Sequence, residues 1–419
     1  MTQNQTQRPN YLFPLIVVFI VCFLIGFITT MNNSMIAFCT DAFKLNAQQG
    51  QYVNTAFYGA YLLSIPFAML MNKIGYKGTL LLGLAVAGAG FVINSIGINA
   101  AIKAQANVYL IFLICMCIVA MGVVMLQNVA NPYVKVLGAP ESGAFRMTLS
   151  QALNSVATTV APIFITTFII AGKDPKAPEA GSYVPGPFLG LGLFTLLICL
   201  ILVFLKLPDP DKDEVKQEDT LADTATAYKS SAFKYPHVWL CALAIFMYMG
   251  VEIGVPSMLP YKFRDMMGEG SNYASVATGF LAFYWGGMMV GRFIGAGILT
   301  KFKPRNLLSV CLLLGAVCIL LSILLPGKAG IWAMLAAGLF HSVMWPLIFN
   351  LGLEELGPNT KTASGIINTG VIGGALLTPI MGIVVDKSGV LVASACLFIF
   401  YAYILWFCLF GSKIGLQKK

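Results

Sequence analysis

Charged residues are scarce in this chain of 419 residues, since Asp, Glu, Lys and Arg together make up 10% and hydrophobic residues make up 58%. An average soluble domain carries roughly 25% charged residues. The scarcity of charge excludes an ordinary soluble protein and indicates that most of the chain lies in lipid.

Histidine is nearly absent too, with two residues in the whole sequence. There is no phosphate-binding glycine loop, no histidine-rich metal cluster and no nucleophile motif. These absences argue against a membrane enzyme, and we expect no metal and no organic cofactor. The ten cysteines lie in or beside apolar runs without metal-ligand spacing, so we expect inert packing residues.

Long apolar runs dominate what is present. A lipid-spanning helix needs about 20 mostly apolar residues, and the sequence offers twelve such runs, at residues 12–38, 54–72, 78–98, 107–131, 148–171, 187–207, 237–260, 275–297, 305–325, 329–351, 363–385 and 389–411. The first run is too long for a cleavable signal peptide and is interpreted as the first helix. We therefore predict an all-α membrane protein with twelve transmembrane helices.

The net charge of +9 comes from unevenly placed basic residues. With the N-terminus placed in the cytoplasm, 17 of the 26 Lys and Arg residues fall on the cytoplasmic side, 8 fall outside, and Arg292 lies within a helix. Cytoplasmic loops of membrane proteins carry such an excess. The pattern predicts that both chain ends are cytoplasmic, and it explains the positive charge without a nucleic-acid partner.

One segment, residues 208–235, is polar, charged and poor in large apolar side chains, which is typical of a solvated linker. It divides the chain into residues 1–207, the linker, and residues 236–419, with six runs on each side. The two sides echo each other: "FYGAYLLSIPFAMLMNKIGYK" from Phe57 matches "FYWGGMMVGRFIGAGILTKFKPR" from Phe283. Repeats of this kind resemble the two six-helix halves of the major facilitator superfamily, in which substrate binds between the halves.

Polar side chains inside membrane spans normally face a cavity or another helix, because lipid does not solvate them. The candidate substrate-binding residues are therefore sought among them: Asn33, Tyr58, Gln127, Gln151, Asn154, Glu252, Tyr284, Trp285, His341, Asn350 and Asn368.

Several of these candidates leave two interpretations open. Gln151 and Asn154 lie on one helical face, where their amides could bind the hydroxyls of a sugar or join two helices. Tyr284 or Trp285 could pack on a pyranose ring or only on the core. His341 could relay protons or simply bond a neighbouring helix.

Glu252 is the carboxylate that we place deep in a span, in the seventh helix. It could bind a coupling ion, either by taking up a proton or by offering oxygen ligands to sodium. It could also bind sugar, or pair structurally with Arg292 or His341.

Three smaller features carry predictions of their own. In the loop "NKIGYKG", Gly75 permits a tight turn, and Asn72 stands where an acidic residue is common in the superfamily. Asn131 and Pro132 are expected to end the fourth helix. Closely spaced glycines on the eighth helix, among them Gly286 and Gly291, should allow close helix packing.

Four runs, "MLQNVANPYVKVLG", "GAFRMTLSQALNS", "MGVEIG" and "YWGGMMVGRFIG", resemble the fucose:proton symporter family of the major facilitators, especially its glucose/galactose-type members. The resemblance covers nearly the whole chain. It implies a sugar bound between the halves, entering with a proton or with sodium, and it places Gln151 and Asn154 on the sugar cavity. Where fucose symporters have two acidic residues, this chain has Asn33 and Gln127, and an amide cannot carry a proton.

The combined expectation is a secondary active transporter that imports a monosaccharide by alternating access, coupled to an ion through Glu252. The alternatives are an uncoupled sugar facilitator, an exporter of another small solute, and a sugar sensor that does not transport. The expected setting is the bacterial inner membrane, with lipid contacts and a monomeric state.

Overall fold

The computed structural model describes residues 11–45, 47–50, 52–170, 177, 179–205, 207–208, 228–268 and 273–416. Every regular element in these ranges is helical. The predicted all-α membrane fold is thereby confirmed.

The N-terminal half, defined here as α1 to α7, begins with α1 (Leu12–Ala42) and two short helices, α2 (Ala47–Gly50) and α3 (Tyr52–Gly59). A 3₁₀ turn joins α3 to α4 (Ser64–Lys103), which is followed by α5 (Val108–Val136), α6 (Gly143–Phe164) and α7 (Pro185–Phe204). A π-helical turn, Ile165–Ile170, extends α6.

The C-terminal half, α9 to α15, starts with α9 (Pro236–Met267), α10 (Tyr273–Ile298) and α11 (Pro304–Leu324). The short α12 (Gly327–His341) and α13 (Met344–Gly352) together make one span. The chain closes with α14 (Thr360–Thr369), a 3₁₀ turn and the long α15 (Gly373–Leu409).

Two glycines mark where long helical stretches reverse direction. Gly75 inside α4 has φ 74° and Gly389 inside α15 has φ 84°, a region that side chains with a Cβ rarely adopt. Each stretch is therefore two spans joined by a tight turn, as predicted for Gly75. With these divisions the helices match the twelve predicted runs in order.

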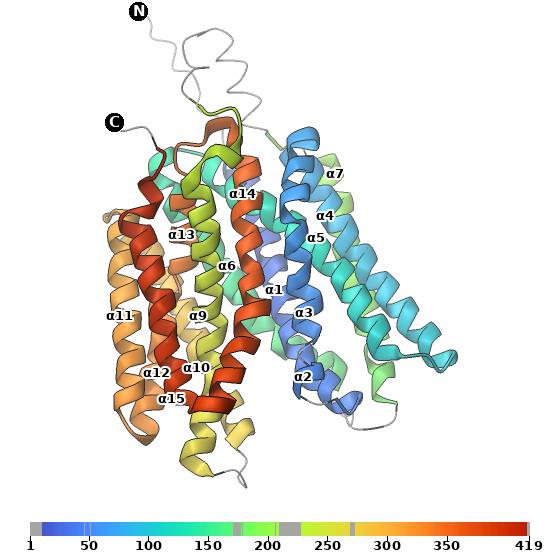
Figure 1. Cartoon of the computed structure of the whole chain (residues 1–419). Helices are drawn as coiled ribbons and strands as arrows, with labels where there is room; N and C mark the ends of the chain where they lie inside the picture. Colours follow the sequence, from blue (N-terminus) through green and yellow to red (C-terminus); the bar gives the residue numbers. More distant parts are fainter. Residues whose placement is uncertain are drawn as a thin grey trace, which may run out of the picture.

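The helices stand side by side as two bundles (Figure 1). Within the N-terminal half, α4 packs on α5 and α7, and α1 packs on α6; in the C-terminal half, α9 packs on α15, and α12 packs on α10 and α11. Between the halves, α6 meets α10 and α14 meets α4 and α5. We call the end of the molecule at which α15 ends in Figure 1 the terminal face, and the opposite end the far face.

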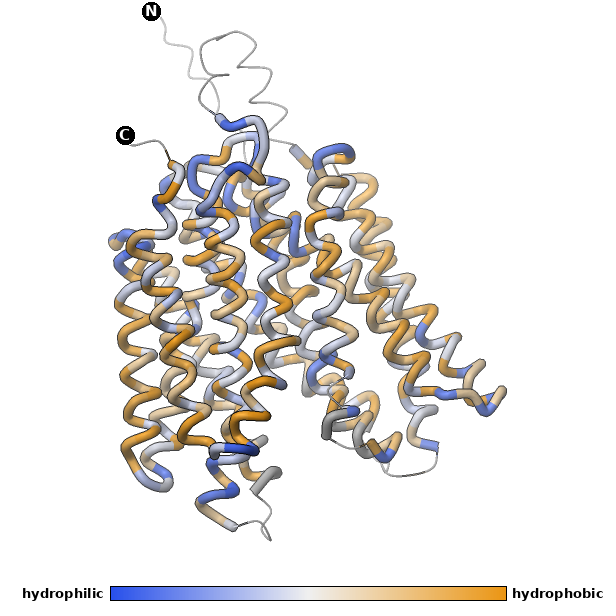
Figure 2. Tube along the Cα trace, in the orientation of Figure 1, coloured by the Kyte–Doolittle hydropathy of each residue, from blue (hydrophilic) through white to orange (hydrophobic). Residues whose placement is uncertain are grey.

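Large hydrophobic side chains cover the outside of the bundles. On α7, for example, Leu193, Phe194 and Leu197 are more than half exposed. Figure 2 shows hydrophobic residues along the length of the helices, whereas hydrophilic residues gather mainly at the helix ends. Such an apolar exterior is suited to lipid contact and not to water.

The prediction that Asn131 and Pro132 end the fourth span is wrong, because α5 continues to Val136. Proline removes one backbone donor from a helix, so the carbonyl of Asn128, four residues earlier, loses its usual partner. That carbonyl instead accepts a hydrogen bond from the Ser364 hydroxyl at 3.1 Å. The replacement partner, from the other half, compensates for the missing helix bond.

Most of the predicted linker, residues 209–227, lies outside the described residues. The boundaries proposed for the two halves stay a prediction.

Candidate functional site

A buried ion pair lies midway along the C-terminal half. Glu252 is near the middle of α9, and its Oε1 lies 3.5 Å from an Nη atom of Arg292 on α10. Their side chains are 15% and 8% exposed. Pairing makes it possible to hold both charges away from bulk water.

Arg292 also reaches the N-terminal half. It donates to the main-chain oxygen of Gln151 at 3.2 Å and to the Ser155 hydroxyl, both on α6. Its Nε donates to the carbonyl of Ser342 at 3.1 Å. One guanidinium group therefore connects the carboxylate of one half to a helix of the other.

A second polar group faces Glu252 from the N-terminal half. The Tyr58 side chain on α3 lies near Asn33 on α1 and near Glu252 on α9. The hydroxyl of Tyr61 donates to Gln127 Oε1 at 2.7 Å. Because Glu252 has neighbours in both halves, its remaining exposure faces the region between the halves and not lipid.

The two α6 amides that were predicted to bind sugar, Gln151 and Asn154, lie on the helix that Arg292 contacts. The Gln151 side chain is partly exposed and has no hydrogen-bond partner among the described residues. Asn154 Nδ2 donates to the carbonyl of Cys22 on α1 at 2.9 Å. A Cβ on Gly26 would lie 2.5 Å from the Asn154 carbonyl, so glycine is needed for this close approach of α1 to α6.

Tyr284 and His341 form a buried network behind Glu252. The Tyr284 hydroxyl donates to the main-chain oxygen of Glu252 at 3.1 Å and lies 2.8 Å from Nδ1 of His341. A tyrosine has one hydroxyl hydrogen, so Nδ1 of His341 is the donor to Tyr284 and Nε2 accepts from Tyr401.

Both ring nitrogens of His341 are therefore occupied, and the ring is fully buried. This arrangement favours the interhelical interpretation of His341 over the relay. Trp285 remains partly exposed and packs edge-on against Tyr284, with ring centroids 5.3 Å apart.

The other two predicted residues, Asn350 and Asn368, lie elsewhere. They belong to a set of contacts between the halves near the terminal face, which we call the terminal seam. Asn368 Nδ2 donates to Asn128 Oδ1 at 2.7 Å, and the Asn350 carbonyl accepts from Lys135 Nζ at 2.9 Å.

The terminal seam also contains Asn72, whose Nδ2 donates to the Thr362 hydroxyl at 2.6 Å. Lys361 Nζ lies 4.4 Å from the centre of the Tyr76 ring. The superfamily's acidic residue is thus replaced by an amide that makes a neutral hydrogen bond to the other half.

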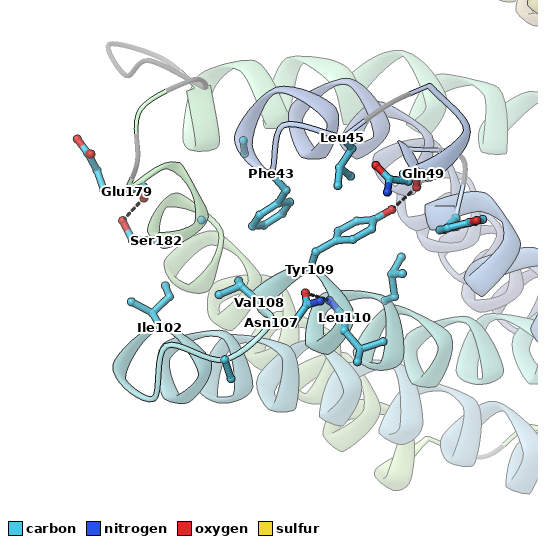
Figure 3. A pocket seen from close by; sticks show the side chains of 15 residues that line it. Phe43, Leu45, Gln49, Ile102, Asn107, Val108, Tyr109, Leu110, Glu179 and Ser182 are labelled. Atoms are coloured by element: carbon cyan, nitrogen blue, oxygen red, sulfur yellow. Dashed lines mark hydrogen bonds between the residues drawn. The ribbon is translucent and has the colours of Figure 1, made fainter.

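The structure also has a pocket at the far face, with a volume of about 630 Å³. Figure 3 shows Phe43 and Tyr109 on its walls, with the Tyr109 hydroxyl donating to the main-chain oxygen of Gln49 at 2.7 Å. None of the predicted site residues lines this pocket. It lies within the N-terminal half and is separate from the polar residues around Glu252.

Sequence reasoning named Arg292 as a possible partner of Glu252 but did not foresee its contacts with α6. It missed Ser155 and Tyr61 as well. A serine four residues after Gln151 does lie on the same helical face, which is the one signal that could have drawn attention to Ser155.

Two helical halves that share polar contacts near the middle of their helices are characteristic of membrane transporters with alternating access. The family model described as "Major Facilitator Superfamily" matches residues 18–371, and the chain belongs to this superfamily. Its function is that of a transporter and not of an enzyme.

Individual relatives extend the match over nearly the full length. A "Glucose/galactose transporter" of Brucella abortus biovar 1 (strain 9-941) is 36% identical over 414 residues, which is 98% of this chain and 97% of the relative. The "L-fucose-proton symporter" of Escherichia coli K12 is 29% identical over 91% of this chain and 89% of its own length.

Among solved structures, FucP, a major facilitator transporter crystallised in the outward conformation, aligns with a TM-score of 0.80. The identity is 26%, and the alignment covers 96% of this chain and 99% of FucP. The proton:xylose symporter XylE aligns with a TM-score of 0.75 at 16% identity, which supports the fold alone.

Proposed function

We propose that this protein imports a monosaccharide by alternating access, with the sugar held between the halves beside α6. The observation that carries the proposal is the polar chain that crosses between the halves, from Asn33 and Tyr58 to Glu252, and through Arg292 to α6. The partly exposed Gln151 amide, with a donor and an acceptor, suits the hydroxyl pattern of a sugar. The names of the relatives support a hexose or a related sugar.

The sugar-binding set in this proposal is narrower than the sequence suggests. It consists of the residues that are partly open or lie beside Glu252, whereas Glu252 itself is assigned to the coupling ion: Asn33, Tyr58, Gln127, Gln151, Asn154 and Trp285. Tyr284 and His341 support Glu252 from behind, whereas Asn350 and Asn368 hold the terminal seam.

The coupling ion that the site favours is a proton, taken up by Glu252. The guanidinium of Arg292 is already 3.5 Å from the carboxylate. A sodium ion about 5 Å from that cation would be repelled by about 3 kcal/mol at an effective dielectric constant of about 20. A proton neutralises the carboxylate without adding a second cation.

The proposed setting is a bacterial inner membrane with the terminal face in the cytoplasm, because Lys and Arg are concentrated on that side. Among the described residues, the hydrogen bonds between the halves lie at mid-membrane or in the terminal seam. This closure of the terminal face supports an outward-facing state, and nothing in the proposed cycle requires more than one copy of the chain.

The test is uptake by the purified protein in liposomes, with labelled D-glucose, D-galactose and L-fucose under imposed proton or sodium gradients. We expect accumulation of at least one sugar with an inward proton gradient and no stimulation by sodium. Equal stimulation by sodium would contradict the proton assignment. Equilibration without accumulation would favour an uncoupled facilitator, and no sugar movement would favour an exporter of another solute or a sensor.

A further inference from the structure

The contacts of Arg292 point beyond its pairing with Glu252. On α10, its guanidinium touches three elements: Glu252 on α9, the Ser342 carbonyl after α12, and α6 of the other half. The first two belong to its own half. The third is a contact between halves, made to the same helix that carries the Gln151 and Asn154 amides.

The position of Arg292 on α10 is enforced by close packing. A Cβ on Gly291 would lie 2.3 Å from the carbonyl of Leu339, so α10 and α12 touch at this level. This contact fixes the direction of the next side chain along the helix. Arg292 is buried and directed towards α6, not towards lipid.

The charge of Arg292 is balanced by Glu252. The titratable and charged side chains around Glu252 come from all the elements packed there: Tyr248 on α9, Tyr284 and Arg292 on α10, His341 on α12, Tyr401 on α15 and Tyr58 on α3. The tyrosines and the histidine are neutral in this hydrogen-bonding arrangement. Arg292 therefore has Glu252 as its single counter-ion among the described residues.

We propose that Arg292 is the positioning residue that transmits the protonation state of Glu252 to the contact between the halves. The inference deepens the proposed function and rests on it. When Glu252 is ionised, the pair holds the guanidinium against Ser155 and the Gln151 carbonyl, and α6 stays docked on α10.

When Glu252 takes a proton from water entering at the far face, its negative charge is lost and the ion pair disappears. A buried arginine without a counter-ion is costly, so its guanidinium moves towards the water between the halves. The hydrogen bonds to Ser155 and the Gln151 carbonyl then break, and the two halves are free to rock. Release of the proton restores the pair and the docked state.

The first experiment measures this rocking without any sugar. Nitroxide labels are placed on the exposed residues Lys103 and Lys328 at the far ends of the two halves, as Lys103→Cys and Lys328→Cys, and the distance distribution is measured by electron paramagnetic resonance. The native cysteines described here are buried or half-buried, so the exposed positions label preferentially.

We expect Glu252→Gln and Arg292→Gln each to shift the label distances towards a closed far face, and the double variant to shift them no further. Additive shifts, or no shift in Glu252→Gln, would overturn the proposal. Arg305→Gln is the matched control, because Arg305 pairs with Glu354 at 3.6 Å near the terminal face and makes no hydrogen bond or ion pair to α6 among the described residues. It should leave the distances unchanged.

The second experiment uses sugar in liposomes, with the same variants and labelled D-glucose or D-galactose. Arg292→Gln leaves a buried carboxylate unpaired and should lower counterflow about tenfold or more. Adding Glu252→Gln should restore counterflow but not accumulation. Unrestored counterflow in the double variant would assign Arg292 a structural role only.

The two experiments distinguish failure of the sugar assignment from failure of the role proposed for Arg292. If the wild-type protein moves no sugar but the label distances follow the expected pattern, the sugar assignment fails and the role of Arg292 stands. If sugar accumulates normally in Arg292→Gln, the role of Arg292 fails and the transport function stands.

Discussion

At the scale of single residues, Glu252 is set apart by its surroundings. Its carboxylate is paired with Arg292, faces Tyr58 from the other half, and is backed by the Tyr284 and His341 network. The two acidic positions familiar from fucose symporters are amides here, Asn33 and Gln127, which cannot release a proton. Glu252 is thus the one carboxylate in this polar chain.

Glu252→Gln should therefore abolish accumulation of sugar against its gradient while sparing counterflow. Glutamine keeps the shape and much of the hydrogen bonding of glutamate, but it has no ionised form. The measurement is uptake in liposomes with and without an inward proton gradient, alongside exchange of internal unlabelled for external labelled sugar. Normal accumulation by this variant would show that the coupling ion binds elsewhere.

Two glycines of α10, Gly286 and Gly291, differ in how closely other atoms approach them. A Cβ on Gly291 would lie 2.3 Å from a backbone oxygen, whereas a Cβ on Gly286 would meet nothing within 4 Å. The sequence shows both as equivalent small residues.

Gly291→Ala should therefore destabilise the protein by about 1–3 kcal/mol, as overpacking typically does. It should also impair transport, because it displaces Arg292. Gly286→Ala on the same helix is the matched control and should change neither. Thermal unfolding in detergent and liposome uptake measure the two effects, and equal behaviour of the two variants would contradict the packing described for α10.

At the scale of elements, the end of α5 near the terminal face makes hydrogen bonds to helices of both halves. Pro132 leaves the Asn128 carbonyl without a helix partner, and the Ser364 hydroxyl takes its place. The Asn128 side chain adds contacts to Ser64 on α4 and Asn368 on α14. Pro132 thus leaves the Asn128 carbonyl available as an acceptor in the terminal seam.

Pro132→Ala should weaken the terminal seam, because the restored backbone donor competes with Ser364 for the Asn128 carbonyl. Ser364→Ala should act in the same direction. We expect both to shift the Lys103→Cys and Lys328→Cys label distances towards a closed far face, as the terminal face opens more often. Unchanged distances in both variants would mean that this hydrogen bond does not limit opening.

At the scale of the whole molecule, the halves are joined at the terminal face by hydrogen bonds, one of them from the Lys135 ammonium, and by a cation–π contact. Asn72 with Thr362 and Lys361 over Tyr76 are examples. A large hydrophobic seal between the halves would hinder rocking. Contacts that can be exchanged for water suit an interface that opens in every cycle.

The orientation of the whole molecule gives a further prediction. Lys103 and Lys328 should face the periplasm, and Lys301 and Lys413 the cytoplasm, because basic residues concentrate on the terminal side. Replaced singly by cysteine, the first two should react with a membrane-impermeant maleimide in intact cells. The other two should react only after permeabilisation, and labelling of Lys413→Cys in intact cells would reverse the assigned orientation.

Much of the fold follows from the sequence because membrane insertion depends on local composition. The length and hydropathy of each run predicted the twelve spans, and Gly75 marked a tight turn. The helix end assigned to Pro132 was wrong because the group that replaces the missing helix bond to the Asn128 carbonyl is Ser364, 236 residues from Asn128.

The candidate site, like the fold, was predicted from the sequence only in part. The local sequence is enough to identify the polar side chains that lie within lipid-spanning helices, since that depends only on neighbouring residues. Which of these side chains meet is known only once the helices are packed: Arg292 reaches Ser155, 137 residues away, and Asn368 bonds Asn128, 240 residues away. Such pairs depend on how each helix is rotated and packed against the opposite half, and no local pattern of residues encodes that rotation.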